Sequence, residues 1–357
     1  MQEVTKNIFP IEWNLKDELK VPYHGKKVFG TFVCGGGSTM GYKLAGYDHL
    51  GGVEFTEHYS KVYKYNHKPK YFYLEDIREF NKRTDLPQEL YDLDILDGSP
   101  PCAAFSTAGA REKNWGKIKD YEGIKQVKDD LVYVYCETIE KLKPKVFLLE
   151  NVSGLAKGNA KVYLKRVVDR LSKEYEVQVF LIYAASMGIP QIRNRIFIIG
   201  HRKEYKLPKL ELNFRVPQLG FEVTKKYWGI LDNNTFHDKI NNLAIGKEWD
   251  NVKIGENSNK YFNLCKPHPK NPCFTITESS SSSSAASVMH PTIKRKLNEK
   301  EVRMLCTFPK DYDFLDTNAI STMGRSVLPV MMANISHQIY LQWLSKIKKN
   351  GVDITNK

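Results

Sequence analysis

One cysteine stands where a parallel α/β sheet usually places its catalytic groups. Cys102 follows the short apolar segment Leu93–Asp97 and two consecutive prolines, Pro100 and Pro101. Such sheets bind ligands beyond the carboxyl ends of their strands, and the proline rings stiffen the connection. A thiol in this place favours nucleophilic chemistry. A buried structural cysteine is the alternative interpretation.

A glycine-rich turn lies near the start of the chain. Val28–Cys34 predicts a strand, and Gly35, Gly36 and Gly37 lead into a segment with helical spacing. A strand, a glycine turn and a helix let a ligand approach the backbone at a helix N-terminus. A tight turn without any ligand has the same pattern.

Two acidic positions extend this pattern. Glu54 ends the next predicted strand, Gly51–Glu54, and Asp76 with Ile77 follows a further short strand. An acid about twenty residues after a glycine turn commonly holds ribose hydroxyls. Together, these residues predict a cofactor that contains a nucleoside.

A carboxylate and two guanidinium groups complete the candidate set. Glu150 ends the apolar segment Val146–Leu149, and Arg193 and Arg195 lie two residues apart on one face of a predicted strand. Two neighbouring cations favour an anion between them. A helix cap for Glu150 and a solvated sheet edge for the arginines are the alternatives.

The order of predicted elements gives the fold class. Apolar segments alternate with helical ones over the first 201 residues, which indicates an α/β fold with a doubly wound, mostly parallel sheet. The remaining predicted strands are Val177–Tyr183 and Arg195–Gly200, and the predicted helices are Tyr121–Leu142 and Lys161–Tyr175.

Composition changes after His201. Residues 202–292 are rich in Asn, Pro, Ser and Lys, and the serine run Ser279–Ser284 predicts a mobile loop. Helical spacing returns in Leu297–Leu305. Val327–Leu344 predicts a long amphipathic helix, which we expect to pack back on the first domain. We therefore predict a first domain at 1–201, a smaller irregular domain at 202–292, and a return to the first domain at 293–357.

Charge and composition point to a polyanionic partner. The 357 residues include 54 Lys and Arg against 41 Asp and Glu, a net charge of +13. Such an excess favours nucleic acid over an anionic membrane. Apolar runs are too short for a membrane span, and six cysteines without paired spacing argue against disulfides and a metal site. We expect a cytoplasmic protein, monomeric because no heptads occur.

Five motifs, taken in order, resemble those of the DNA cytosine-5 methyltransferases. The resemblance runs from about Lys27 to Ile339. The motifs are Pro101-Cys102, Glu150-Asn151-Val152, Gln191-x-Arg193-x-Arg195, the stretch from Arg295 to Pro309, and Gly324-Arg325-Ser326-Val327. The resemblance implies a Rossmann-like S-adenosylmethionine-dependent fold, and residues 202–292 as its target-recognition domain.

The resemblance implies a role for each catalytic residue. Cys102 would add to C6 of a flipped cytosine, so that C5 can attack a sulfonium carbon. Glu150 would supply a proton or hydrogen bond at N3. Arg193 and Arg195 would hold the base or its phosphate and stabilise the developing charge.

The resemblance also implies the binding residues. For the adenosyl donor these are Phe32, Gly35, Gly36, Gly37, Glu54, Phe55, Asp76, Ile77, Ala103, Arg325 and Ser326. For double-stranded DNA they are Ser106, Gln191, Thr275 and Ile276.

Three positions depart from the family pattern. Ala103 replaces the usual Gln, Arg325 replaces the usual Asn, and Cys34 replaces a leading Gly. The first two lie, in the family, around the transferred methyl group. An Arg about 6 Å from a sulfonium, at an effective dielectric near 20, would repel it by roughly 3 kcal/mol. That is about a hundredfold in affinity.

An anion on the transferred group would reverse this effect. The carboxylate of carboxy-S-adenosylmethionine would pair with Arg325 and fill the space at Ala103. We therefore favour carboxymethyl transfer, with 5-carboxymethylcytosine as product. Ordinary methylation from S-adenosylmethionine, in restriction-modification or phage protection, is the alternative, with Arg325 on DNA phosphate or in solvent.

Two further interpretations stay open. The family has a branch that acts on tRNA, and the long segment 202–292 favours DNA over it. A non-catalytic DNA-binding relative is the other, and retention of Cys102, Glu150, Arg193 and Arg195 argues against it.

Overall fold

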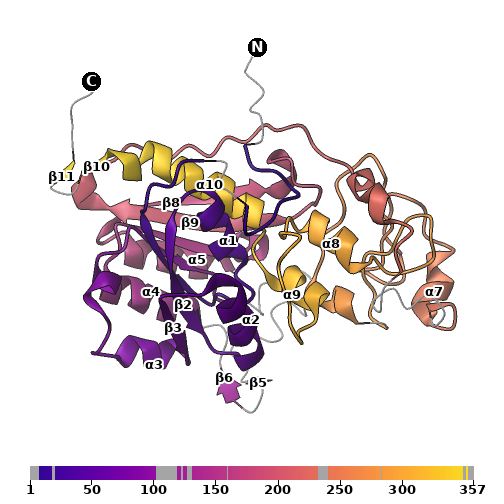
Figure 1. The fold of residues 1–357 in the computed structure, drawn as a ribbon, viewed down its shortest axis with the longest axis horizontal. Coiled ribbons are helices and arrows are strands. Elements are labelled where there is room, and N and C mark those ends of the chain that lie inside the picture. Colours follow the sequence, from indigo (N-terminus) through magenta and orange to yellow (C-terminus); the bar gives the residue numbers. More distant parts are fainter. Residues whose placement is uncertain are drawn as a thin grey trace.

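Strands with apolar residues on both faces form the centre of the molecule. The computed structural model describes residues 8–17, 21–101, 119–121, 124–126, 131–158, 160–231, 240–282, 284–348 and 351–352. Within them, a seven-stranded sheet has the order β3-β2-β1-β4-β7-β9-β8 (Figure 1). The strands are β1 (Lys27–Thr31), β2 (Asp48–Glu54), β3 (Tyr71–Leu74), β4 (Ile95–Gly98), β7 (Val146–Val152), β8 (Tyr175–Tyr183) and β9 (Asn194–Arg202).

Strand direction confirms the predicted fold class. Strands β3, β2, β1, β4 and β7 pair in parallel, and β9 is antiparallel to both of its neighbours. The sheet is thus mostly parallel and Rossmann-like. Parallel strands are buried on both faces, which explains the continuous apolar run Val146–Leu149 of β7.

Alternate side chains of the strands supply two separate cores. Val28 and Val146 pack on one face with residues of α1 (Gly37–Leu44) and α10 (Pro329–Gln342). Their neighbours in the chain, including Phe147, pack on the other face. The helices there are α3 (Ile77–Lys82), α4 (Leu131–Leu142) and α5 (Ala160–Leu171). Period-two alternation therefore builds a three-layer fold.

One predicted helix was too long at its start. The segment Tyr121–Leu142 was expected to be helical throughout, but the described helix α4 begins at Leu131. Before it, β5 (Lys119–Tyr121) pairs with β6 (Ile124–Gln126) as antiparallel strands. Gly123, a residue of low helix propensity, lies in the predicted helix, and the spacing of apolar residues takes no account of it. The predicted helix Lys161–Tyr175 also ends early, because Tyr175 belongs to β8.

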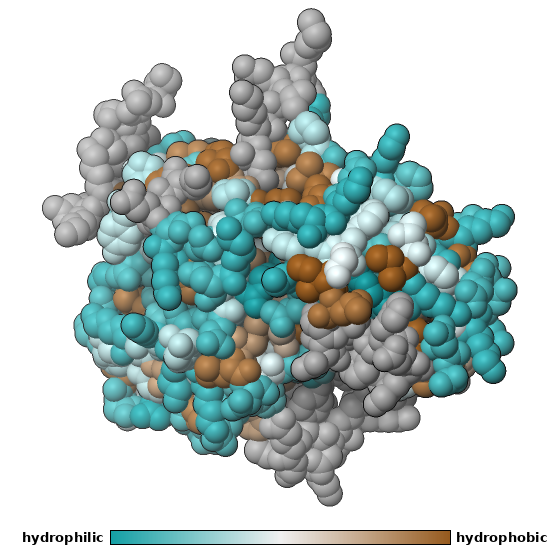
Figure 2. All heavy atoms as spheres, turned by 45° about the vertical axis from the view of Figure 1, so that its right-hand side comes forward, coloured by the Kyte–Doolittle hydropathy of each residue, from teal (hydrophilic) through white to brown (hydrophobic). Residues whose placement is uncertain are grey.

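The segment 202–292 is irregular, as expected. Its described elements are η5 (Lys203–Tyr205), η6 (Phe221–Tyr227), α7 (Ala244–Trp249) and η7 (Glu278–Ser281). A small core of its own surrounds Ile240, Ile245 and Leu264. Charged and polar side chains cover most of the face that this side of the molecule presents (Figure 2). The division into three sequence ranges stays a prediction.

Part of the serine run is ordered. Ser279–Ser281 belong to η7, a 3-10 turn whose N-cap is Thr277. The side chains of Thr277 and Ser280 cap each other's backbone N–H groups. A capping box satisfies donors that the first turn leaves unpaired, so this part of the predicted mobile loop has a defined geometry.

The chain returns to the sheet at its end. The returning segment contains α8 (Glu299–Leu305) and α9 (Ala319–Arg325). Helix α2 (Glu57–His67) contacts β2 and β3. Helix α10 packs on α1, as expected, but Pro329–Ser336 is buried all round rather than amphipathic. The remaining short elements are η1 (Gln88–Tyr91), η3 (Ser153–Ala156), η4 (Ala184–Ser186), η8 (Leu344–Lys346), β10 (Ile347–Lys348) and β11 (Gly351–Val352).

Candidate active site

The carboxyl ends of the central strands are level with one another. Thr31 of β1 is in register with Gly98 of β4, and Gly98 is in register with Leu149 of β7. The loops that begin at Phe32 and Ser99, and the side chain of Glu150, therefore meet at one edge of the sheet. This edge is where open α/β sheets bind their ligands.

A cavity of about 700 Å³ opens at this edge. Its walls include predicted donor residues and predicted catalytic residues together. These are Phe32, Gly37, Glu54, Phe55, Asp76, Ile77, Arg193, Arg195, Arg325 and Ser326. Cys102, Ala103 and Ser106 lie outside the described residues, but Pro101, which directly precedes Cys102, lines the same cavity.

Glu54 braces the loop after β1. Its carboxylate, 7% exposed, accepts hydrogen bonds from the backbone N–H groups of Cys34 (2.8 Å), Phe55 (3.0 Å) and Thr56 (2.8 Å). Burial raises the pKa of Glu54, while these donors act in the opposite direction. Phe32 and Cys34 both have positive φ, so the brace holds a strained loop in place.

The cavity has the composition that an adenosyl group requires. Phe32 and Ile77 contribute apolar residues to its wall, and the acidic residues Glu54 and Asp76 line the same space. Asp76 is also the N-cap of α3, where it accepts from the backbone N–H of Arg78 at 2.8 Å. Ligand pockets commonly combine apolar walls with a few fixed polar groups. The residues therefore fit the predicted donor.

The glycines of the loop also allow close packing against other parts of the protein. A Cβ at Gly37 would lie 2.1 Å from the carbonyl oxygen of Val327, and one at Gly36, where φ is +71°, would lie 2.1 Å from Nε2 of His67. Gly35 and Gly36 are not among the residues lining the cavity. Gly37 thus lets the loop pack against the connection between α9 and α10, and Gly36 lets it pack against the end of α2. The predicted contact of the three glycines with the donor stays a prediction.

Glu150 and Arg195 form a buried ion pair. Nε of Arg195 lies 3.0 Å from Oε1 of Glu150, and Glu150 is 8% exposed. Burial raises the pKa of Glu150, although Arg195 and Arg193 act against the shift. A carboxyl with a raised pKa keeps its proton at higher pH, which suits a proton donor.

Asn151 connects this strand end to the proline loop. Its side-chain amide donates to the carbonyl of Pro100 at 3.1 Å, and its side-chain oxygen accepts from the N–H of Val152 at 2.8 Å. Asn151 is 3% exposed. The Glu-Asn-Val motif therefore fixes the backbone two residues before Cys102.

Arg193 ties two distant segments together. Its guanidinium donates to the carbonyls of Ile276 (3.0 Å), Gly324 (3.2 Å) and Ser326 (2.9 Å). The side chain is buried, so in this conformation it holds backbone of both segments beside the cavity. Its predicted contact with the base or phosphate stays a prediction.

The predicted DNA contacts Gln191, Thr275 and Ile276 also bond to protein here. Gln191 is fully buried, with its amide donating to the carbonyl of Leu305 at 3.1 Å and its oxygen accepting from the N–H of Ile276 at 3.2 Å. The hydroxyl of Thr275 donates to the carbonyl of Ile192. The Gln-x-Arg motif thus anchors Thr275-Ile276, and their contact with DNA stays a prediction.

Arg325 lines the same cavity, and its predicted contact with the donor stays a prediction. Its guanidinium pairs with the carboxylate of Glu278, and its Cζ lies 5.6 Å from the centre of the Tyr59 ring. The neighbouring Ser326 donates its hydroxyl to the carbonyl of Thr322 at 2.8 Å. The ion pair places an acid beside the unusual cation.

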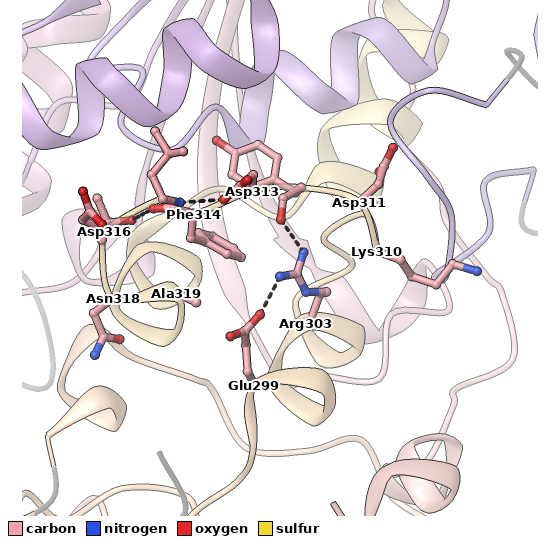
Figure 3. A pocket seen from close by; sticks show the side chains of 12 residues that line it. Glu299, Arg303, Lys310, Asp311, Asp313, Phe314, Asp316, Asn318 and Ala319 are labelled. Carbon is pink, nitrogen blue, oxygen red and sulfur yellow. Dashed lines mark hydrogen bonds and ion pairs between the residues drawn. The ribbon is translucent and has the colours of Figure 1, made fainter. Parts of the chain in front are cut away.

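A second cavity, of about 600 Å³, lies beside α8. Its walls are Glu299, Arg303 and the loop from Lys310 to Ala319, and Arg303 reaches between Glu299 and the loop backbone (Figure 3). Arg303 donates to the carbonyls of Pro309 (2.8 Å) and Tyr312 (2.9 Å). The Tyr312 hydroxyl in turn donates to the carbonyl of Gly35 at 2.6 Å. The loop from Lys310 to Ala319 therefore supports the glycine turn that follows β1.

Several residues of the cavity escaped the sequence analysis. Asp97, Tyr59, Asn263 and Glu278 line it without having been predicted. Asp97 is the residue before the last one of β4, close to the proline loop, and this position could have marked it. Burial raises its pKa to about 7, and the Tyr42 hydroxyl donates to it at 3.2 Å. Glu278 carries no local signal, because its partner is far away in the sequence.

Among the described residues, no group of three or more His, Cys, Asp and Glu side chains could hold a metal ion. In the same part of the chain, no helix has the length and apolar character that a bilayer crossing requires.

Known proteins are similar to this chain in sequence and in fold. The chain is 26% identical to the type II methyltransferase M.NgoPII of Neisseria gonorrhoeae, over 87% of this chain and 94% of that one. It is 30% identical to M.FnuDI of Fusobacterium nucleatum over 58% of this chain and 56% of that one.

Solved structures show the same fold at lower identity. A putative DNA modification methyltransferase from an Escherichia coli prophage superposes with a TM-score of 0.65 at 18% identity, over 89% of this chain and 99% of that one. A DNMT2 mutant from Spodoptera frugiperda gives 0.64 at 17%, over 88% and 100%. The model of the C-5 cytosine-specific DNA methylases matches residues 27–341. The chain therefore belongs to the C-5 cytosine-specific DNA methylase family.

Proposed function

We propose that this protein transfers a carbon group from an S-adenosyl sulfonium donor to C5 of cytosine in double-stranded DNA. One observation carries the proposal: a single cavity is lined by predicted donor-binding residues and by predicted catalytic residues. Glu54 and Asp76 of the donor set line it together with Arg195, which pairs with Glu150. Pro101, next to Cys102, lines it as well.

The proposed reaction uses Cys102 as a covalent catalyst. Its thiolate forms a bond to C6 of a flipped cytosine, which makes C5 nucleophilic enough to attack the donor carbon. The carbon–sulfur bond of the donor breaks and leaves a neutral thioether. Loss of the C5 proton then expels the Cys102 thiolate and restores the aromatic ring.

Glu150 and Arg195 are proposed to control the charge on the ring. Burial shifts the pKa of Glu150 upward, which is the direction that helps its carboxyl deliver a proton to N3 as the thiolate adds. Arg195 orients that carboxyl through the 3.0 Å contact and adds a positive charge beside the base. Glu150→Gln tests this role, because the amide keeps the shape but cannot transfer a proton.

Duplex DNA is the proposed substrate. The net charge of +13 suits a polyanion, and the relatives from Neisseria and Fusobacterium are named as type II methyltransferases. Covalent trapping on duplex DNA that contains 5-fluorocytosine tests both substrate and nucleophile. Wild type should form an adduct stable in denaturant, and Cys102→Ser should not. An adduct with tRNA alone would instead support the tRNA interpretation.

The donor is the finer part of the proposal. We propose carboxymethyl transfer from carboxy-S-adenosylmethionine as the activity that distinguishes this chain within its family. The supporting observation is the place of Arg325, which lines the cavity beside Phe32 and Ser326. A guanidinium there can accept a donor carboxylate in two hydrogen bonds.

Ordinary methylation is the second candidate, and the Arg325–Glu278 pair favours it. The paired acid neutralises the cation, so S-adenosylmethionine does not meet the full repulsion of an isolated arginine. The experiment offers duplex DNA with each donor separately and weighs the modified deoxycytidine by mass spectrometry. A carboxymethyl product formed faster at equal donor concentration supports the first candidate, and a methyl product alone supports the second.

A further inference from the structure

Glu278 stands opposite the unusual cation of the donor cavity. It opens η7, in the segment that follows Ile276, and it lines the same cavity as Arg325 at the end of α9. The two side chains form an ion pair across 47 residues of sequence. Their side chains are 49% and 30% exposed, so the pair borders the cavity rather than lying inside the protein core.

Backbone packing fixes the distance between the two elements. A Cβ at Gly324 would lie 2.4 Å from the carbonyl carbon of Thr277, so only glycine lets α9 approach η7 this closely. The guanidinium of Arg193 binds the carbonyls of both Ile276 and Gly324. The buried guanidinium of Arg193 thus holds the backbone two residues before Glu278 and one residue before Arg325. The positions of both members of the ion pair are therefore set by the fold.

The position of Glu278 gives it opposite effects on two kinds of donor. A sulfonium donor without a carboxymethyl group adds one positive charge, which the carboxylate attracts and Arg325 repels. A carboxymethyl donor brings a carboxylate that needs the guanidinium that Glu278 already holds. We propose that Glu278 is a specificity-determining residue that sets the balance between the two candidate donors: it lowers the repulsion of S-adenosylmethionine by neutralising Arg325, and it competes with a donor carboxylate for the same guanidinium. The inference rests on the proposed use of this cavity for an adenosyl donor.

The test is equilibrium binding of three ligands without DNA or turnover. Wild type and Glu278→Gln are titrated with S-adenosylmethionine, with S-adenosylhomocysteine, which lacks the sulfonium charge, and with carboxy-S-adenosylmethionine. We expect the ratio of the affinity for S-adenosylmethionine to the affinity for S-adenosylhomocysteine to be about tenfold lower in the variant than in wild type. We expect it to bind carboxy-S-adenosylmethionine several-fold more tightly than wild type. A purely structural role would shift all three ligands together.

Two further variants sharpen the test. Removing Arg325 as well, in Glu278→Gln with Arg325→Asn, should abolish the tighter binding of the carboxymethyl donor, because the guanidinium is gone. Glu140→Gln is the matched control, since Glu140 pairs with Arg170 at a similar exposure and neither residue lines the donor cavity. It should leave all three affinities unchanged.

The outcomes separate this inference from the proposed function. Equal shifts for S-adenosylmethionine and S-adenosylhomocysteine in Glu278→Gln, or no shift at all, would overturn the role of Glu278 while the donor site stands. Failure of wild type to bind any of the three ligands would overturn the donor site itself. A ratio that changes only in Glu278→Gln supports the inference.

Discussion

The side-chain amide of Asn151 donates to the carbonyl of Pro100 across 51 residues of sequence. The bond joins the end of β7 to the loop that leads into Cys102. Glu150, the neighbour of Asn151, pairs with Arg195 at the same strand end. The motif that supplies the predicted proton donor therefore also positions the backbone of the predicted nucleophile.

We predict that Asn151→Ala lowers the rate of adduct formation more than tenfold, because the loop before Cys102 loses its buried anchor. The affinity for the donor should stay near that of wild type. Single-turnover trapping and donor titration measure the two quantities separately. Asn81→Ala is the control, since Asn81 makes an amide-to-carbonyl bond of 3.1 Å with Val134 away from the cavity. A wild-type trapping rate in Asn151→Ala would contradict the prediction.

Arg193→Lys should destabilise the protein by about 2–4 kcal/mol, because an ammonium cannot reach the three carbonyls that the guanidinium binds. Thermal unfolding should show a Tm lower by several degrees. Arg170→Lys, at a partly exposed ion pair with Glu140, should change stability by less than about 1 kcal/mol. Equal Tm values for the two variants would argue against a stabilising role of the three bonds from Arg193 to backbone carbonyls.

Gly37→Ala should weaken donor binding at least about tenfold and lower Tm, since the new Cβ would lie 2.1 Å from the carbonyl oxygen of Val327. The loop would have to move away from the α9–α10 connection and so change the cavity wall. Gly229→Ala is the matched control, because a Cβ there meets nothing within 4 Å. Donor titration of both variants decides, and unchanged affinity in Gly37→Ala would count against the packing argument.

Asp97 should make stability fall as pH rises. Burial raises its pKa to about 7, whereas an Asp in the unfolded chain titrates near pH 4. Between about pH 4 and pH 7 the native state therefore holds more of this proton than the unfolded state, and the free energy of unfolding decreases with pH. Asp97→Asn should flatten this dependence. Unfolding curves of both proteins from pH 5 to pH 8 measure it, and identical slopes would exclude Asp97 as the cause.

The sequence by itself determined the strands and the order of the motifs. Burial on both faces of a parallel sheet demands continuous apolar runs, so the first four residues of β7, Val146–Leu149, could be recognised from their composition. Glu54 and Glu150 could be placed at strand ends for the same reason. Helix limits were less well determined, and the start of α4 shows it, because helical spacing before Leu131 belongs to a segment that includes paired strands.

Only the tertiary structure decided which groups meet. Arg193 binds Ile276 and Ser326, which are 83 and 133 residues away, and Glu278 meets Arg325 only because α9 returns against η7. Local periodicity records whether a side chain is buried, but it does not record its partner. That partner depends on close backbone approach at positions such as Gly37 and Gly324, which the fold as a whole sets.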